Sequence, residues 1–119
     1  GVSHNGTSNY LVQIGDAGGI ETTGYLSTSS QSGANATSTA GFIITASTTA
    51  ASVHHGNIVL TLKDSTAFTW TSGSTVARGD LAFSSGGVKS LTAELTQVSV
   101  TSVSADTFDA GSINIMYIS

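Results

Sequence analysis

The stretch SLTAELTQVSVTSV, residues 90–103, carries the clearest secondary-structure signal in this chain. Within it, Val98 and Val100 alternate with Ser99 and Thr101, so apolar and hydroxyl side chains fall on opposite sides of an extended backbone. β-Branched residues at this spacing favour a strand that has one buried face and one solvated face. The stretch therefore predicts a half-buried β-strand.

The same alternation recurs along the chain, between clusters of Gly, Ser, Asn and Asp that are typical of turns. It predicts further strands at residues 9–14, 20–28, 41–46, 56–63, 68–71, 81–83 and 112–118. The segments between them are predicted to be turns or loops, at residues 15–19, 29–40, 47–52, 64–65, 84–87 and 106–111. About eight strands at this spacing, with no convincing helix, predict an all-β, antiparallel β-sandwich that is jelly-roll-like.

The alternation also predicts which side chains face the core. The residues expected to point inward from two of these strands are Tyr10, Val12, Ile14, Ile58, Leu60 and Leu62. Gly24 interrupts the predicted strand at residues 20–28, where it indicates a bulge or a close approach of another backbone.

The last predicted strand, residues 112–118, is apolar on both faces. One face carries Ile113, Ile115 and Tyr117, and the other carries Asn114, Met116 and Ile118. Such a strand is typical of the centre of a sheet or of a subunit contact. The chain has no Pro and few basic residues, which are the residues that usually block the edges of sheets. We therefore expect neighbouring subunits to cover the sheet edges.

The composition argues against several classes of function. Only 8% of the 119 residues are charged and 39% are hydrophobic, which suits a folded β domain with a hydroxyl-rich surface. The net charge is −4 and the only cations are Lys63, Arg78 and Lys89, so binding of nucleic acid or of an anionic membrane is not expected. No Cys is present for a disulfide, and no apolar stretch reaches the roughly 20 residues that span a bilayer.

The length predicts a single domain, residues 1–119. Because the chain begins at Gly1 and not at Met, we expect it to be a processed product or a fragment of a longer chain.

No residue pattern predicts catalysis or a cofactor. His54 and His55 are the best candidates for a metal site, but neighbouring strand residues point to opposite faces, so an ion would need one histidine from each of three chains. The seven carboxylates show no spacing that pairs two of them across a cleft, as a glycosidase requires. Asp106 and Asp109 are expected to bond backbone N–H groups of a local turn and not calcium. The chain is therefore predicted not to be an enzyme and to hold no metal or cofactor.

Aromatic and histidine side chains are the candidates for contact with a receptor or a second subunit. They are Tyr10, Tyr25, His54, His55 and Tyr117. Tyr and Trp rings can stack on sugars, although core packing is the alternative and is favoured for Trp70. His4 is expected to be a polar loop residue.

Two long stretches carry a family resemblance. They are SNYLVQIGDAGGIETTGYLS at residues 8–27 and GGVKSLTAELTQVSVTSVSADTFDAGSINIMYIS at residues 86–119, and GFIITA and GNIVLTLKDSTAFTW between them also fit. This nearly whole-chain pattern resembles the C-terminal module of virion structural proteins of tailed bacteriophages or prophages, of the tail-fibre type. The resemblance implies a homotrimer on the tail or the capsid surface of a virion, and it supplies no catalytic residues.

The resemblance, the lack of a catalytic set and the uncovered sheet edges lead to three hypotheses about function. The first is a tail-fibre or tail-tip module that attaches to a host surface glycan or an outer-membrane protein. The second is a capsid decoration, or cement, protein that stabilises the head lattice together with other virion proteins. The third is a self-assembling surface filament subunit that exchanges strands between copies.

Overall fold

The computed structural model describes residues 1–118, which form eleven strands and no helix. No helix long and apolar enough to cross a membrane occurs in these residues. The strands are β1 (Ser3–His4), β2 (Tyr10–Asp16), β3 (Gly19–Ile20), β4 (Leu26–Gln31), β5 (Ala34–Ser38), β6 (Phe42–Ile43), β7 (His55–Asp64), β8 (Thr69–Arg78), β9 (Leu81–Ser90), β10 (Gln97–Ser102) and β11 (Phe108–Ala110).

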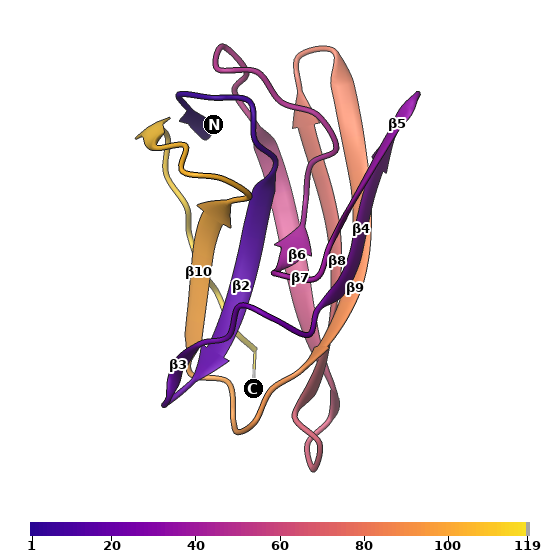
Figure 1. Cartoon of the computed structure of the whole chain (residues 1–119), viewed down its shortest axis with the longest axis vertical. Coiled ribbons are helices and arrows are strands. Elements are labelled where there is room, and N and C mark those ends of the chain that lie inside the picture. Colours follow the sequence, from indigo (N-terminus) through magenta and orange to yellow (C-terminus); the bar gives the residue numbers. More distant parts are fainter. Residues whose placement is uncertain (119) are drawn as a thin grey trace.

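The strands form two facing sheets and one small pair, all antiparallel (Figure 1). The larger sheet has the order β5-β4-β9-β8-β7. In the smaller sheet β2 pairs with β10, β3 and β6, while β1 pairs with β11 beside the N-terminus. The predicted all-β sandwich is confirmed, with eleven strands in the described residues in place of about eight, and β8 and β9 extend well beyond the strands predicted at residues 68–71 and 81–83.

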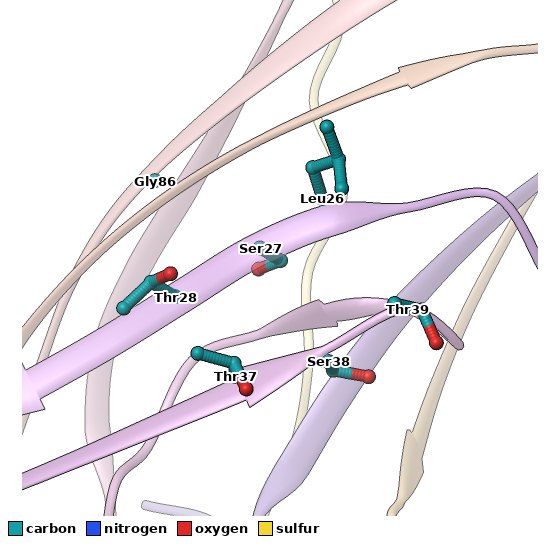
Figure 2. Close-up of a pocket in the computed structure, with 7 residues that line it drawn as sticks. All are labelled: Leu26, Ser27, Thr28, Thr37, Ser38, Thr39 and Gly86. Carbon is teal, nitrogen blue, oxygen red and sulfur yellow. The ribbon is translucent and has the colours of Figure 1, made fainter.

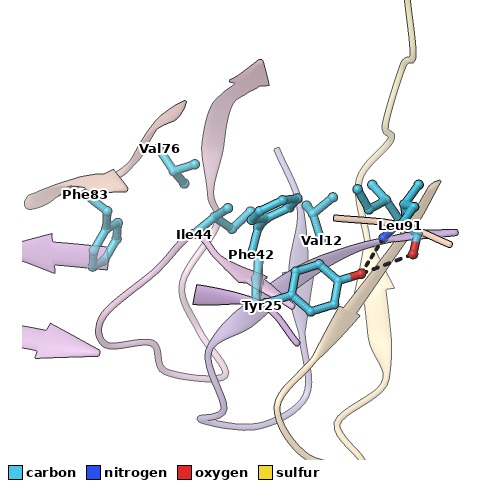
Figure 3. Packing of buried hydrophobic residues seen from close by; sticks show 9 residues of the cluster. Val12, Tyr25, Phe42, Ile44, Val76, Phe83 and Leu91 are labelled. Carbon is cyan, nitrogen blue, oxygen red and sulfur yellow. Dashed lines mark hydrogen bonds between the residues drawn. The ribbon is translucent and has the colours of Figure 1, made fainter. Parts of the chain in front are cut away.

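The core lies between the two sheets. Tyr10, Val12 and Ile14 are all buried on β2, as their alternation predicts. Opposite them lie Val76 of β8 and Phe83 of β9, whose positions are paired across those two strands. Figure 3 shows this cluster, in which apolar side chains from both sheets interdigitate.

Two segments rich in small residues are strands, although the sequence predicted a loop and a turn. Residues 29–40 complete β4 and form β5, which join in a hairpin around Gly33, where φ is +89°. Residues 84–87 lie inside β9. There Gly87 makes room for Phe42, because a Cβ at Gly87 would lie 2.8 Å from Phe42 Cδ1. These small residues therefore lie within a strand, where they leave space for side chains from elsewhere in the sandwich, and they do not mark a turn.

Two other predicted strands are shorter than expected. Residues 20–28 are divided between β3 and β4 by a loop at Gly24, whose φ of +77° favours glycine in a turn. The predicted bulge or close backbone approach is wrong, because the nearest atom to a Cβ at Gly24 would be the Lys89 side-chain Nζ, at 3.4 Å. Residues 41–46 contain only the two-residue β6, although Phe42 to Ile44 are buried. The apolar run at residues 41–46 thus predicts burial correctly, but only part of it pairs as a strand.

On β7 the inward pattern is confirmed in part. Ile58 and Leu60 pack against the core, whereas Leu62 is exposed near the end of the hairpin. The turn at residues 64–68 is held by Asp64, whose carboxylate accepts hydrogen bonds from the N–H groups of Thr66 and Ala67. Trp70, on the opposite strand of this hairpin, is half-buried against the core, as favoured.

Candidate functional site

A cleft opens on one side of the sandwich, between the edges formed by β7 and β10. It has a volume of about 430 Å³ and is lined mainly by apolar side chains of both sheets. Its lining includes Tyr10, Val12, Ile44, His54, Ile58, Val76 and Val100. The start of the terminal segment, which we define as residues 112–118, also lies at this cleft through Ser112, Ile113 and Asn114.

His54 is the buried polar residue of the cleft wall, whereas the other polar residues that line it, such as His55 and Asn57, are exposed. Its side chain is only 4% exposed, and its ring lies 4.7 Å from the Tyr10 ring and 6.1 Å from the Phe83 ring, between ring centroids. Its backbone forms an isolated bridge with Val2. Neither imidazole nitrogen has a hydrogen-bond partner among residues 1–118. Burial lowers the pKa of His54, because the imidazolium form would lose its hydration there.

The terminal segment is not a strand in this chain, so the predicted strand at residues 112–118 is wrong. Its backbone runs alongside the smaller sheet from β11 towards the opposite end of the sandwich (Figure 1). Its apolar side chains are exposed, from 54% for Ile113 to 91% for Ile118. The alternation in sequence is that of a strand, but no strand in the described part of the chain pairs with it.

The predicted contact residues divide into two groups. Tyr10, Tyr25 and His54 are buried, because their rings fill the space between the sheets, and this removes them from the surface. His55 and Tyr117 are exposed. The two histidines thus lie on different sides of the backbone, and residues 1–118 contain no group of three His, Cys, Asp or Glu side chains arranged for a metal.

Tyr25 anchors the side of the core that lies away from the cleft. Its ring packs edge-on against Phe42, with the ring centroids 5.1 Å apart. Its hydroxyl accepts a hydrogen bond of 2.9 Å from the Ile14 N–H (Figure 3). It also lies 2.8 Å from the Glu21 carbonyl oxygen, to which it donates. The ring of Tyr25 is therefore packed, and its hydroxyl is hydrogen-bonded, within one chain.

A polar network that the sequence did not predict lies beside Tyr25. Lys89 Nζ is 2.5 Å from Glu21 Oε2 and 5.2 Å from the centre of the Tyr25 ring. The Thr92 hydroxyl is 2.5 Å from Asp16 Oδ2 and 3.0 Å from Glu21 Oε1. The fold thus brings together two carboxylates, although their spacing in the sequence gave no sign of a pair.

Both carboxylates of this network are held in their ionised form. The hydrogen bond from Thr92 lowers the pKa of Asp16. Burial acts to raise the pKa of Glu21, but the hydrogen bonds from Lys89 and Thr92 outweigh it and lower that pKa. A general acid needs a raised pKa, so this pair suits a structural role that ties β2, β9 and the loop after β9 together.

Asp106 and Asp109 were predicted to bond a local turn, and this is wrong. Asp106 instead accepts hydrogen bonds from the N–H and hydroxyl of Ser8, and these lower its pKa. Asp109 accepts a hydrogen bond of 2.6 Å from the Ser3 hydroxyl. His4 is fully buried and not a loop residue on the surface, and its Nε2 donates to the Ser8 carbonyl oxygen. These contacts join the two ends of the chain, which sequence spacing cannot reveal.

The outer face of the five-stranded sheet forms a second surface. The strand register aligns mainly small and hydroxyl side chains in rows across this sheet. One row consists of Val59, Gly73, Gly86, Thr28 and Thr37. A shallow depression of about 280 Å³ lies on this sheet around β4 and β5, with Leu26, Thr28 and Thr37 among its lining residues (Figure 2).

In comparisons with known proteins, no family model, curated protein or solved structure matches this chain.

Proposed function

We propose that this chain is a structural module of a tailed-phage virion, of the tail-fibre type, that attaches the particle to the host surface through the outer face of its larger sheet. The observation that carries the proposal is the chemistry of this face. A second row across it, Asn57, Thr75, Ser84, Ser30 and Asn35, again presents amides and hydroxyls without charge. Such a face offers many hydrogen-bond donors and acceptors to a polar partner.

The same face also determines which partner fits best. Sugar-binding sites commonly stack aromatic rings on the sugar, but Tyr10 and Tyr25, which the sequence offered for this role, are buried. Leu26 and Val59 are exposed apolar residues on the outer face. A flat surface of hydroxyl, amide and scattered apolar side chains favours a protein partner, such as an outer-membrane protein, over a glycan.

The test is binding of the purified, labelled full chain to host cells and its competition with phage adsorption. We expect binding that a Thr28→Arg, Thr75→Arg double variant weakens about tenfold, because each Arg places a bulky charge in the centre of the face. Ala105→Arg, at an exposed bend outside the larger sheet, is the matched control and should bind like the unchanged chain. Absence of binding, or equal loss in the control, would contradict the attachment role.

Capsid decoration is the second candidate, favoured by the exposed apolar residues of the terminal segment, which suit insertion into a neighbouring subunit. Copy number distinguishes the two candidates. Hundreds of copies in each virion would support decoration, whereas a few copies would support a fibre.

A further inference from the structure

The cleft side of the sandwich has two free strand edges. In residues 1–118, β7 pairs only with β8, and β10 pairs only with β2. β7 is ten residues long, contains no Pro and has a single Lys, so little opposes the addition of another strand to it. The cleft lies between these edges, and Gly56, Asn57 and Ile58 of β7 line it.

The floor of the cleft is apolar but includes unpaired polar groups. Val12, Val76 and Val100 lie along it, while both nitrogens of the buried His54 ring have no partner in the described part of the chain. A buried polar group without a hydrogen bond is unfavourable, and most such groups in folded proteins are paired. A segment entering this cleft would cover Ile58 and Val100, which are only partly buried in one chain, and would lie beside the wall that contains His54.

The terminal segment has the sequence of such a strand. Ile113, Ile115 and Tyr117 alternate on one face, and six extended residues span about 20 Å, the length of an ordinary strand. In its own chain, this segment touches the cleft only with residues 112–114, and residues 115–118 leave their side chains exposed. The strand-like terminal segment and the free edge of β7 are therefore both present in one sequence, but they do not pair within one copy.

The start of the segment explains why its own cleft is not filled. β11 pairs with β1, and Gly111 follows with a φ of +103°. A Cβ at Gly111 would lie 1.9 Å from the Gly1 carbonyl oxygen, so the two backbones are in close contact there. This contact fixes the point and the direction in which the terminal segment leaves the sandwich.

We propose that residues 113–118 of one copy add as a strand to the free edge of β7 in a second copy and fill its cleft. A strand that one copy adds to the sheet edge of the next is a head-to-tail contact between identical chains, which closes into a ring or continues as a filament. Backbone hydrogen bonds to β7 would give affinity, and alternate side chains would enter the cleft. This inference concerns assembly and stands independently of host attachment.

The chain contains no Cys, so introduced cysteines report contacts directly. Two full-length variants, Ile58→Cys and Ile115→Cys, are mixed and oxidised, with one variant isotopically labelled so that mixed dimers are identified by mass. We expect the mixed disulfide dimer as the main product. Val59→Cys is the matched control, because Val59 is the next residue of β7 but lies on the outer face. It should give about tenfold less mixed dimer.

A variant that carries both Ile58→Cys and Ile115→Cys in one chain separates exchange from self-closure. Disulfides between chains support the proposal, whether the product is a closed ring or a filament. Disulfides only within one chain, or equal yields with Val59→Cys, would overturn it. Light scattering of Ile58→Lys and Val59→Lys gives a second readout, in which only Ile58→Lys should shift the protein to monomer. Host-cell binding is measured in a separate experiment. The attachment proposal can therefore fail while strand addition between copies is supported, and strand addition can fail while attachment is supported.

Discussion

The side of the sandwich around Tyr25 and the side around the cleft differ in how far one chain completes them. Around Tyr25, the hydroxyl is hydrogen-bonded and Lys89 is paired with Glu21. Around the cleft, His54 is equally buried, but its ring nitrogens have no partner in residues 1–118, and the adjoining terminal segment exposes its apolar side chains. Low exposure alone therefore does not show that a core is complete; the hydrogen bonds of its polar atoms show it.

The largest expected effect tests whether the Tyr25 side holds the fold together. Phe42→Ala removes a fully buried ring from between Tyr25 and Gly87, and it should lower the free energy of unfolding by about 3–5 kcal/mol. Urea denaturation measures it. Leu26→Ala, on the exposed face of β4, should change the stability by less than about 0.5 kcal/mol. Similar values for the two variants would mean that this side is not tightly packed.

A single methyl group can test the close packing at the same place. Gly87→Ala would place its Cβ 2.8 Å from Phe42 Cδ1 and 2.9 Å from the Leu26 carbonyl oxygen, so we expect a loss of about 1–3 kcal/mol in thermal or urea unfolding. Gly86→Ala is the matched control, since its nearest neighbour would be the Ser72 carbonyl oxygen at 3.8 Å. Gly86→Ala should be neutral or slightly stabilising. If both variants lost the same stability, the cause would be the replacement of glycine within β9 and not the contact with Phe42.

The hydrogen bonds of the Tyr25 side can be tested without a change in volume. Tyr25→Phe keeps the ring but leaves the buried Ile14 N–H without its acceptor, so it should cost about 1–3 kcal/mol. Tyr117→Phe, at an exposed position, should have no measurable effect on unfolding. If Tyr25→Phe were neutral, the distinction drawn between the two sides would lose its main support.

The smallest effect concerns pH on the cleft side. Because the pKa of His54 is lowered in the folded chain from its ordinary 6.5, the unfolded chain binds the proton more readily. The stability that comes from keeping His54 neutral in the folded chain is fully present above pH 6.5, and it is lost as the pH falls from there towards the lowered pKa. His54→Leu should reduce the decline, which chemical denaturation at a series of pH values measures. An unchanged pH dependence in this variant would show that His54 does not cause it.

Local patterns predicted a buried strand face in this protein better than the bounds of its strands and turns. The alternation of Tyr10, Val12 and Ile14 reports a buried face directly, since a strand shows its two faces in turn. The small residues at positions 84–87 were misleading, because Gly and Ser favour turns when taken alone. Their position within β9 depends on Phe42, which lies far away in the sequence, and no local pattern contains that information.

The candidate sites were less predictable than the fold. Among the residues expected to make contacts, His55 and Tyr117 are exposed, while Tyr10, Tyr25 and His54 serve the core. An aromatic residue on a strand has the same local pattern whether it faces a core or a partner. Which sheet covers it is decided by the pairing of strands.

The amino-acid pattern was sufficient to establish an all-β chain, its low charge and the strand-like alternation of the terminal segment, because these depend only on composition and on a period of two residues. Only the folded molecule revealed the bond between Asp106 and Ser8, the Asp16 and Glu21 pair at Thr92, and the open edge of β7. Each of these joins or separates groups that are distant along the chain. Their distances are therefore set by how the sheets pair and pack, and not by neighbouring residues.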